Sequence, residues 1–66
     1  MELLILKSNQ HYIRVREDGF ETVNLDRASV FPMDQMDRVR DHAARLKTKG
    51  FESVHIRKLI LSETDL

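Results

Sequence analysis

The segment from Phe31 to Phe51 constrains the fold most, because it is the only stretch long and periodic enough to predict a helix. Its apolar residues recur three or four positions apart, which places them along one stripe of a helix: Met36, Val39, Ala43 and Leu46. Charged residues fill the opposite side. The pattern therefore predicts an amphipathic helix that covers one face of another element.

Both ends of this helix carry sequence signals. Pro32 suits the first helical position, because its missing N–H has no helical partner there in any case. Gly50 supplies the left-handed residue that ends many helices, and Phe51 after it can contact Leu46, as in a Schellman motif. We expect the helix to begin at Pro32 and to end just before Gly50.

Three short strands are predicted before the helix and one after it. They cover residues 3–7, 11–16, 20–25 and 54–61. The first is an unbroken apolar run, which is typical of a strand covered on both faces. The fourth contains a similar run at Leu59–Leu61, which predicts an end that is buried on both faces or contains a bulge.

These elements predict an α+β fold with a four-stranded, mainly antiparallel sheet and one helix on one face, in the order β-β-β-α-β. The two strands with continuous apolar runs, the first and the fourth, are expected to be parallel neighbours, which gives the strand order 3-2-1-4. Residues 1–61 would form a single domain, and residues 62–66 a mobile polar tail.

The turn between the second and third strands must bring the apolar residues of both to one face. A three-residue loop, Glu17–Gly19, does so, because it pairs Ile13 with Val23 and Arg16 with Phe20. We therefore expect the glycine of this loop to be left-handed and to form a G1 bulge. Phe20 would then share a face with Arg16.

Length and charge limit the classes of function. A 66-residue chain buries only about 60% of its unfolded surface, and without cysteines it has no disulfide to compensate, which favours oligomerisation. Lack of cysteine also fits the cytoplasm. The 11 basic and 11 acidic residues balance, whereas nucleic-acid-binding domains usually show a basic excess. The apolar N-terminus is too short for a signal peptide or a membrane span.

A single helix can cover only one face of the sheet, and apolar residues remain for the other face. Large exposed apolar patches usually mark an interface. We therefore predict a homodimer, formed through the uncovered sheet face or through the edge of the fourth strand. Part of Leu59–Leu61 would extend the patch. The predicted interface residues are Leu3, Ile5, Tyr12, Arg14, Arg16 and Phe20.

No catalytic, cofactor or metal motif is found. His11, His42 and His55 lack the spacing of metal ligands, and no nucleophile motif or glycine-rich phosphate loop is present. The chain is therefore interpreted as a non-enzymatic interaction module. One alternative is a regulatory or nucleic-acid-binding protein, because tyrosine and phenylalanine beside arginines on a sheet can stack bases and hold phosphates. A third class is an enzyme or small-molecule binder with its site between subunits.

Overall fold

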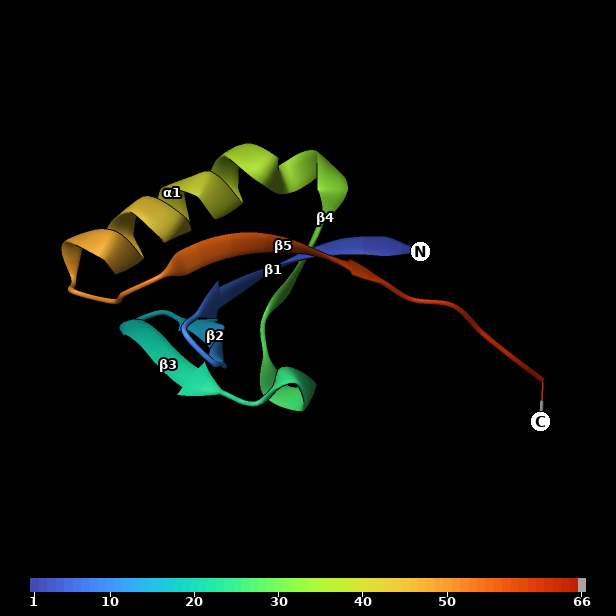
Figure 1. Cartoon of the computed structure of the whole chain (residues 1–66). Helices are drawn as coiled ribbons and strands as arrows, with labels where there is room; N and C mark the ends of the chain where they lie inside the picture. The colour runs from blue at the N-terminus through green and yellow to red at the C-terminus, as the bar shows by residue number, and fades with distance from the viewer. Residues whose placement is uncertain (66) are drawn as a thin grey trace.

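The structure is a computed structural model that describes residues 1–65 (Figure 1). Its first strand, β1 (Glu2–Ser8), lies inside the sheet, with other strands on both sides. The α+β class is confirmed, with one α-helix packed on a five-stranded antiparallel sheet. The other elements follow in chain order: β2 (His11–Arg16), β3 (Gly19–Val23), the 3-10 turn η1 (Leu25–Arg27), β4 (Val30–Pro32), the 3-10 turn η2 (Met33–Gln35), α1 (Met36–Thr48) and β5 (Val54–Ile60).

Strand β1 has a neighbour on each side along almost its whole length. On one side β5 pairs with it from Glu2 to Ser8. On the other side β2 pairs only with Lys7 and Ser8, whereas β4 pairs with residues 3–5. The β1–β2 hairpin therefore opens beyond its turn, and β4 fills the gap. The predicted order 3-2-1-4 is confirmed with β5 as the last strand, and β4 is an additional strand that sequence reasoning missed.

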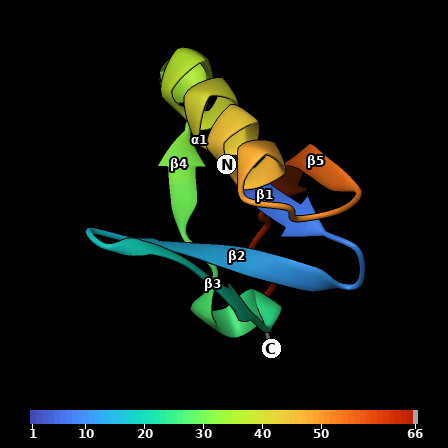
Figure 2. The ribbon, with the colours of Figure 1, turned by 90° about the vertical axis from the view of Figure 1, so that its left-hand side faces the viewer.

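The expected parallel pairing of the first and last strands is wrong. Both β4 and β5 run antiparallel to β1, so they run parallel to each other on its two sides. The chain leaves β4, crosses over β1 through α1 and returns as β5 (Figure 2). Because no strand was predicted at residues 30–32, and Pro32 was assigned to the helix, the direction in which the helix would return the chain could not be inferred.

The predicted helical stripe forms one half of the core. Val39, Ala43 and Leu46 of α1 are buried, and Met36 packs against them. The sheet contributes the other half through the buried residues Leu4, Leu6 and Ile13. The unbroken apolar run of β1 is covered on both faces as predicted, since Leu4, Ile5 and Leu6 are at most 3% exposed.

The helix begins later than predicted. Pro32 is extended, with ψ of 154°, and belongs to β4, while the α-helix begins at Met36 after the 3-10 turn. Phe31 and Pro32 lie opposite Leu4 and Leu3 of β1, and this pairing holds them in an extended conformation. A sheet contact therefore overrides a helix-start signal that proline alone would favour.

The end of the helix is a Schellman motif, as predicted. The N–H of Phe51 donates to the carbonyl of Leu46 at 3.1 Å, and the N–H of Gly50 donates to the carbonyl of Lys47 at 3.1 Å. Gly50 has φ of +95°, a conformation that residues with a side chain rarely adopt.

We expect Gly50→Ala to destabilise the fold by about 1–3 kcal/mol, because alanine is strained at this positive φ. No atom lies within 4 Å of a Cβ built at Gly50, so the backbone conformation is the only source of the loss. Urea unfolding measures it. Lys47→Ala is the matched control, since Lys47 is exposed in the last turn of α1 and should change stability little. Equal stability of both variants would contradict the assignment.

The predicted register of the β2–β3 hairpin is wrong. Only Glu17 and Asp18 form the loop, and Arg16 lies opposite Gly19, so that Val15 pairs with Phe20. Gly19 has φ of +150°, a region that favours glycine, but the G1 bulge is not formed. The shift of one position moves Phe20 to the face that packs under α1.

The contacts of Phe20 explain this register. Its ring meets the rings of His42 and Phe51 edge-on, with centroids 6.0 and 6.4 Å apart. Val23 moves to the opposite face, where it is buried at 9% exposure on the side of the hairpin that holds η1 (Figure 2). Phe20 and Val23 of β3 thus lie on opposite faces of the hairpin, and each face buries one of them. The pattern of apolar residues in β3 alone did not show which face each residue would occupy.

We expect Phe20→Ala to lower the free energy of unfolding by about 2 kcal/mol or more, since it removes a ring packed against the core. Urea denaturation of the variant measures the loss. Thr22→Ala, two positions along the same strand and exposed, should have little effect. If both variants were as stable as the parent chain, Phe20 would not pack beneath the helix.

Candidate functional site

Five of the six predicted interface residues share the sheet face that lies away from α1. Leu3 and Ile5 alternate with the core residues of β1, and Lys7 on the same face lies opposite Tyr12 of β2. Alternation along β2 then places Arg14 and Arg16 on that face as well. Phe20, the sixth residue, lies on the helix side, so the prediction that it belongs to this face is wrong.

The apolar members of this face are already largely covered by the chain itself. Ile5 is 3% exposed and does not belong to the helix-side cluster, so it is buried on the other side of the sheet. Leu3 and Tyr12 are partly buried. What this face presents to solvent around β2 is therefore mainly the two arginines.

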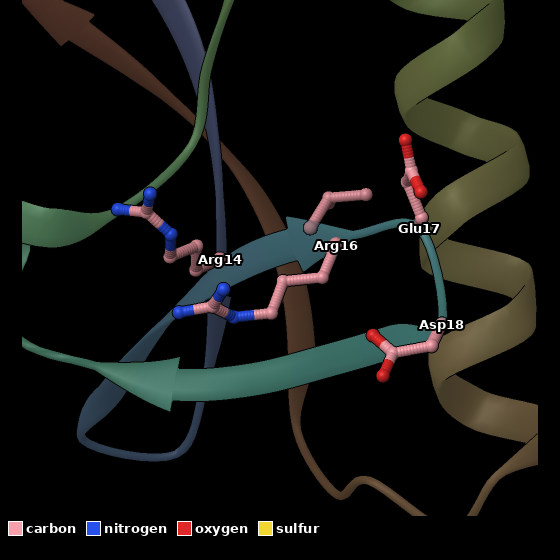
Figure 3. A pocket seen from close by; sticks show the side chains of 5 residues that line it. Arg14, Arg16, Glu17 and Asp18 are labelled. Carbon is pink, nitrogen blue, oxygen red and sulfur yellow. The ribbon is translucent and has the colours of Figure 1, made fainter.

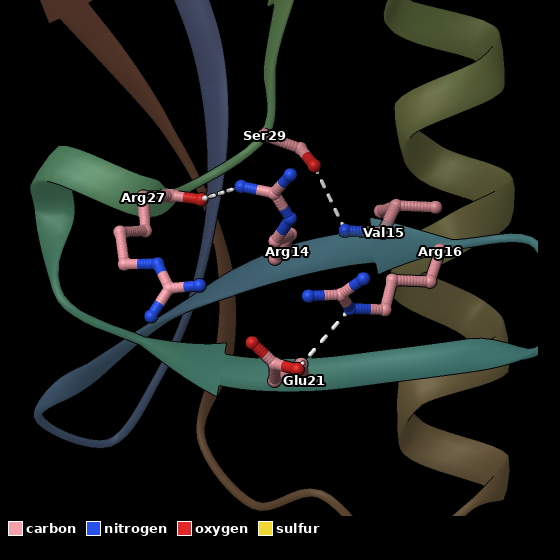
Figure 4. Close-up of polar contacts among 6 residues, drawn as sticks. All are labelled: Arg14, Val15, Arg16, Glu21, Arg27 and Ser29. Carbon is pink, nitrogen blue, oxygen red and sulfur yellow. Dashed lines mark hydrogen bonds and ion pairs between the residues drawn. The ribbon is translucent and has the colours of Figure 1, made fainter.

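The arginines of β2 make contacts within the chain (Figure 4). Arg16 forms an ion pair with Glu21 across the hairpin, with Nε 3.1 Å from Oε2. Arg14 donates from Nη1 to the carbonyl oxygen of Arg27 at 3.3 Å, which ties η1 to β2. The backbone N–H of Val15 donates to Oγ of Ser29 at 2.8 Å, so the connection to β4 is fixed at the same place.

A hollow of about 570 Å³ lies beside these side chains at the tip of the hairpin (Figure 3). Its lining combines two guanidinium groups with two carboxylates: Arg14, Arg16, Glu17 and Asp18, with Val15 between them. The charges balance, so the hollow has no net attraction for phosphate. The Nζ of Lys7 lies 5.2 Å from the centre of the Tyr12 ring, a position that a stacked base would have to share.

The nucleic-acid alternative therefore loses the features that suggested it. Phe20 is on the other face, and the arginines are matched by nearby acids. Lys58 of β5 forms an ion pair with Glu2 at 3.4 Å and lies on the helix side, so it does not add a free cation to this face. Nucleic-acid binding stays an untested prediction without a contact that favours it.

The outer edge of β5 is the second candidate surface. Within the described residues, β5 pairs only with β1, so half of its backbone groups lack a strand partner. Met1 and Leu61 exchange backbone hydrogen bonds of 2.8 and 3.0 Å. Hydrogen-bonded and non-hydrogen-bonded pairs alternate along an antiparallel ladder, so this pair fixes its phase, that is, which residues of β5 bond to β1. Alternate residues therefore direct their N–H and C=O groups to the free edge: Val54, Ile56, Lys58 and Ile60.

Of the six exposed large apolar residues among residues 1–65, three lie where this edge strand ends. Ile60 is 66% exposed, Leu61 44% and Met1 81%. A hollow of about 620 Å³ lies against Met1, Leu61, Ser62 and Glu63. The expectation that Leu59–Leu61 is buried on both faces or contains a bulge is wrong, because the pairing with β1 is regular and this end extends beyond the helix (Figure 1). Part of this run was predicted to extend an exposed apolar patch, and Ile60 and Leu61 are exposed here.

The described residues after Leu61 lie outside any regular structure. Residues 62–65, part of the predicted tail at 62–66, are exposed and lie outside any helix or strand, and Leu66 lies outside the described residues. Figure 1 shows this segment running away from the body of the molecule. Its side chains are consequently accessible to a partner.

His42 is the titratable group whose environment is most unusual. Its ring lies between Phe20 and Phe31, with centroid distances of 6.0 and 5.7 Å, and its buried Nδ1 has no hydrogen-bond partner in the described part of the chain. Burial lowers the pKa of His42 below 6.5, and Arg38 and Arg45 lower it further against the opposing effect of Asp41. The ring lines none of the hollows described above, so we interpret it as part of the core.

No known family model, curated protein or solved structure matches this chain. Among residues 1–65, no group of three or more histidine, aspartate and glutamate side chains is placed to hold a metal ion. Within the same residues, no helix is long and apolar enough to cross a membrane.

We expect the free energy of unfolding to fall as the pH is lowered from about 7 to 5. The pKa of His42 is lower in the folded chain than in the unfolded chain, so the unfolded chain binds the proton first and gains stability. His42→Gln should reduce this dependence, as measured by urea unfolding at a series of pH values. His11→Gln controls for the loss of a histidine, and identical pH dependence in parent and His42→Gln would contradict the assignment.

Proposed function

We propose that this chain is a non-enzymatic interaction module that forms a homodimer through the open edge of β5. The observation that carries the proposal is an unpaired edge strand that ends in exposed Ile60 and Leu61. A row of free N–H and C=O groups is a template for another strand, and proteins usually shield such edges when they are not used for assembly.

The character of the edge supports a specific partner. Its central residues, Arg57 and Lys58, are charged and exposed, a pattern that discourages indiscriminate pairing. Only its end is apolar. An edge with a charged centre and an apolar end restricts how a second strand can align. A partner strand has to match both the charges and the apolar side chains.

The size of the domain supports assembly as well. A 66-residue chain has a small core, here built on one helix and one sheet face, with Ile5 and Val23 buried on the other. Pairing with another subunit would cover Ile60 and Leu61 and satisfy backbone groups at the same time. Both effects stabilise the dimer, and formation of the dimer stabilises the folded chain by mass action.

The solution mass tests self-association. At about 100 μM the chain should sediment at about twice its monomer mass of 7.8 kDa, since stable interfaces hold well below this concentration. Sedimentation equilibrium measures the mass without labels. A mass of 7.8 kDa at every concentration up to about 100 μM would refute the proposed function.

A matched pair of variants separates the edge from the sheet face. Ile60 and Val30 are exposed apolar strand residues, but Ile60 lies on β5 and Val30 lies opposite Ile5 on the face away from α1. Ile60→Lys should give a monomer at about 100 μM, whereas Val30→Lys should remain a dimer. A dimeric Ile60→Lys variant together with a monomeric Val30→Lys variant would indicate an interface on the sheet face and refute the proposed interface at the β5 edge. Circular dichroism melting checks that both variants fold.

A further inference from the structure

We infer that two copies pair antiparallel along β5 with a twofold axis at Ile60, so that residues 55–65 of each chain form one continuous ladder and the segment after Leu61 becomes a strand. This inference rests on the proposed function, and it specifies the partner surface residue by residue. The partner is a second copy of this chain, recognised by the match of charge and apolar character along the edge.

The phase of the ladder limits the possible alignments. Ile60 and Lys58 direct their backbone groups outward, whereas Leu59 and Leu61 direct theirs to β1 and Met1. Outward-facing residues must therefore pair with outward-facing residues of the partner. A twofold axis perpendicular to the sheet satisfies this requirement and also keeps both helices on the same side.

Most alignments that obey this phase are unfavourable. An axis at Arg57 or at Lys58 places a cation opposite the same cation of the partner. An axis at Leu59 places Leu61 opposite the partner's Arg57. An axis at Leu61 places Leu59 opposite the partner's Glu63. Each of these alignments leaves like charges together or an apolar side chain against a charged one.

An axis at Ile60 brings the apolar residues together. Ile60 lies opposite the partner's Ile60, and Leu59 lies opposite the partner's Leu61 on the other face of the sheet. Ile60 and Leu61 are the exposed apolar residues at this end of β5. Leu3 and Met1, which pair with Leu59 and Leu61 in the same chain, flank them and extend the apolar surface across the axis.

The same alignment matches the charges on either side. Arg57 lies opposite the partner's Glu63, and the symmetry repeats this ion pair. His55 lies opposite the partner's Asp65, where an imidazole N–H can donate a hydrogen bond to the carboxylate. All four side chains are exposed in the single chain. These residues occupy non-hydrogen-bonded positions of the new ladder, where opposite Cα atoms approach to about 4.5 Å and side chains interact most closely.

A charge exchange tests the alignment. Arg57→Glu and Glu63→Arg should each raise the dimer dissociation constant about 5- to 10-fold at low salt, because each creates two like-charged pairs across the axis. The double variant restores opposite charges and should bind within about threefold of the parent chain. Sedimentation equilibrium at about 50 mM salt gives the dissociation constants.

Glu17→Arg is the matched control, because it makes the same charge change in the exposed β2–β3 loop and should leave the dissociation constant unchanged. If the parent chain is a dimer but the single exchanges have no effect, or the double variant fails to recover, the alignment at Ile60 is refuted and self-association stands. A monomeric parent chain refutes both. Circular dichroism melting of each variant confirms that dissociation is not caused by unfolding.

Discussion

The structure depends on the pairing of β1 with strands on both sides. Its residues Leu3 to Leu6 form the longest apolar run in the chain. Leu4 to Leu6 are at most 3% exposed, since β5 and β4 flank this part of the strand and α1 covers Leu4 and Leu6. The first hairpin opens so that β4 can lie beside the start of β1. This opening also directs β4 antiparallel to β1, which sets the direction of α1 and of β5. The position of every later element follows from this central strand.

A cluster of aromatic rings connects the hairpin to the helix. Phe20 of β3 and Phe31 of β4 each approach the ring of His42 of α1, with centroid distances of 6.0 and 5.7 Å. These rings come from three elements that are far apart in sequence, so their contacts fix the relative positions of those elements. Within residues 1–65 the buried Nδ1 of His42 has no hydrogen-bond partner, and burial lowers the pKa of the ring, which favours its neutral form. The register of β2 and β3 is a consequence of this packing.

The asymmetry of the two sheet edges bears on function. The β3 edge ends at a hairpin whose charges are matched within the chain, as by the Arg16–Glu21 ion pair. The β5 edge carries Arg57 at its centre and an exposed Ile60 at its end, followed by an acidic segment with Glu63. Basic residues before the apolar end and acidic residues after it make the segment complementary to its own reversed copy. The proposed dimer uses this self-complementarity, whereas the arginine-bearing face has no comparable unmatched feature.

The sequence by itself determined those features that depend on neighbouring residues. The stripe of Val39, Ala43 and Leu46 and the Schellman motif at Gly50 are properties of one helix, and both were predictable. Tertiary structure alone decided the existence of β4, the direction of β5 and the register that buries Phe20. Each of these depends on contacts between distant segments, and a shift of one residue in a strand reverses every side chain. The tertiary structure likewise decided that Ile60 and Leu61 lie exposed at an edge. The sequence shows that the run Leu59–Leu61 is apolar, but it does not show whether other elements cover the run.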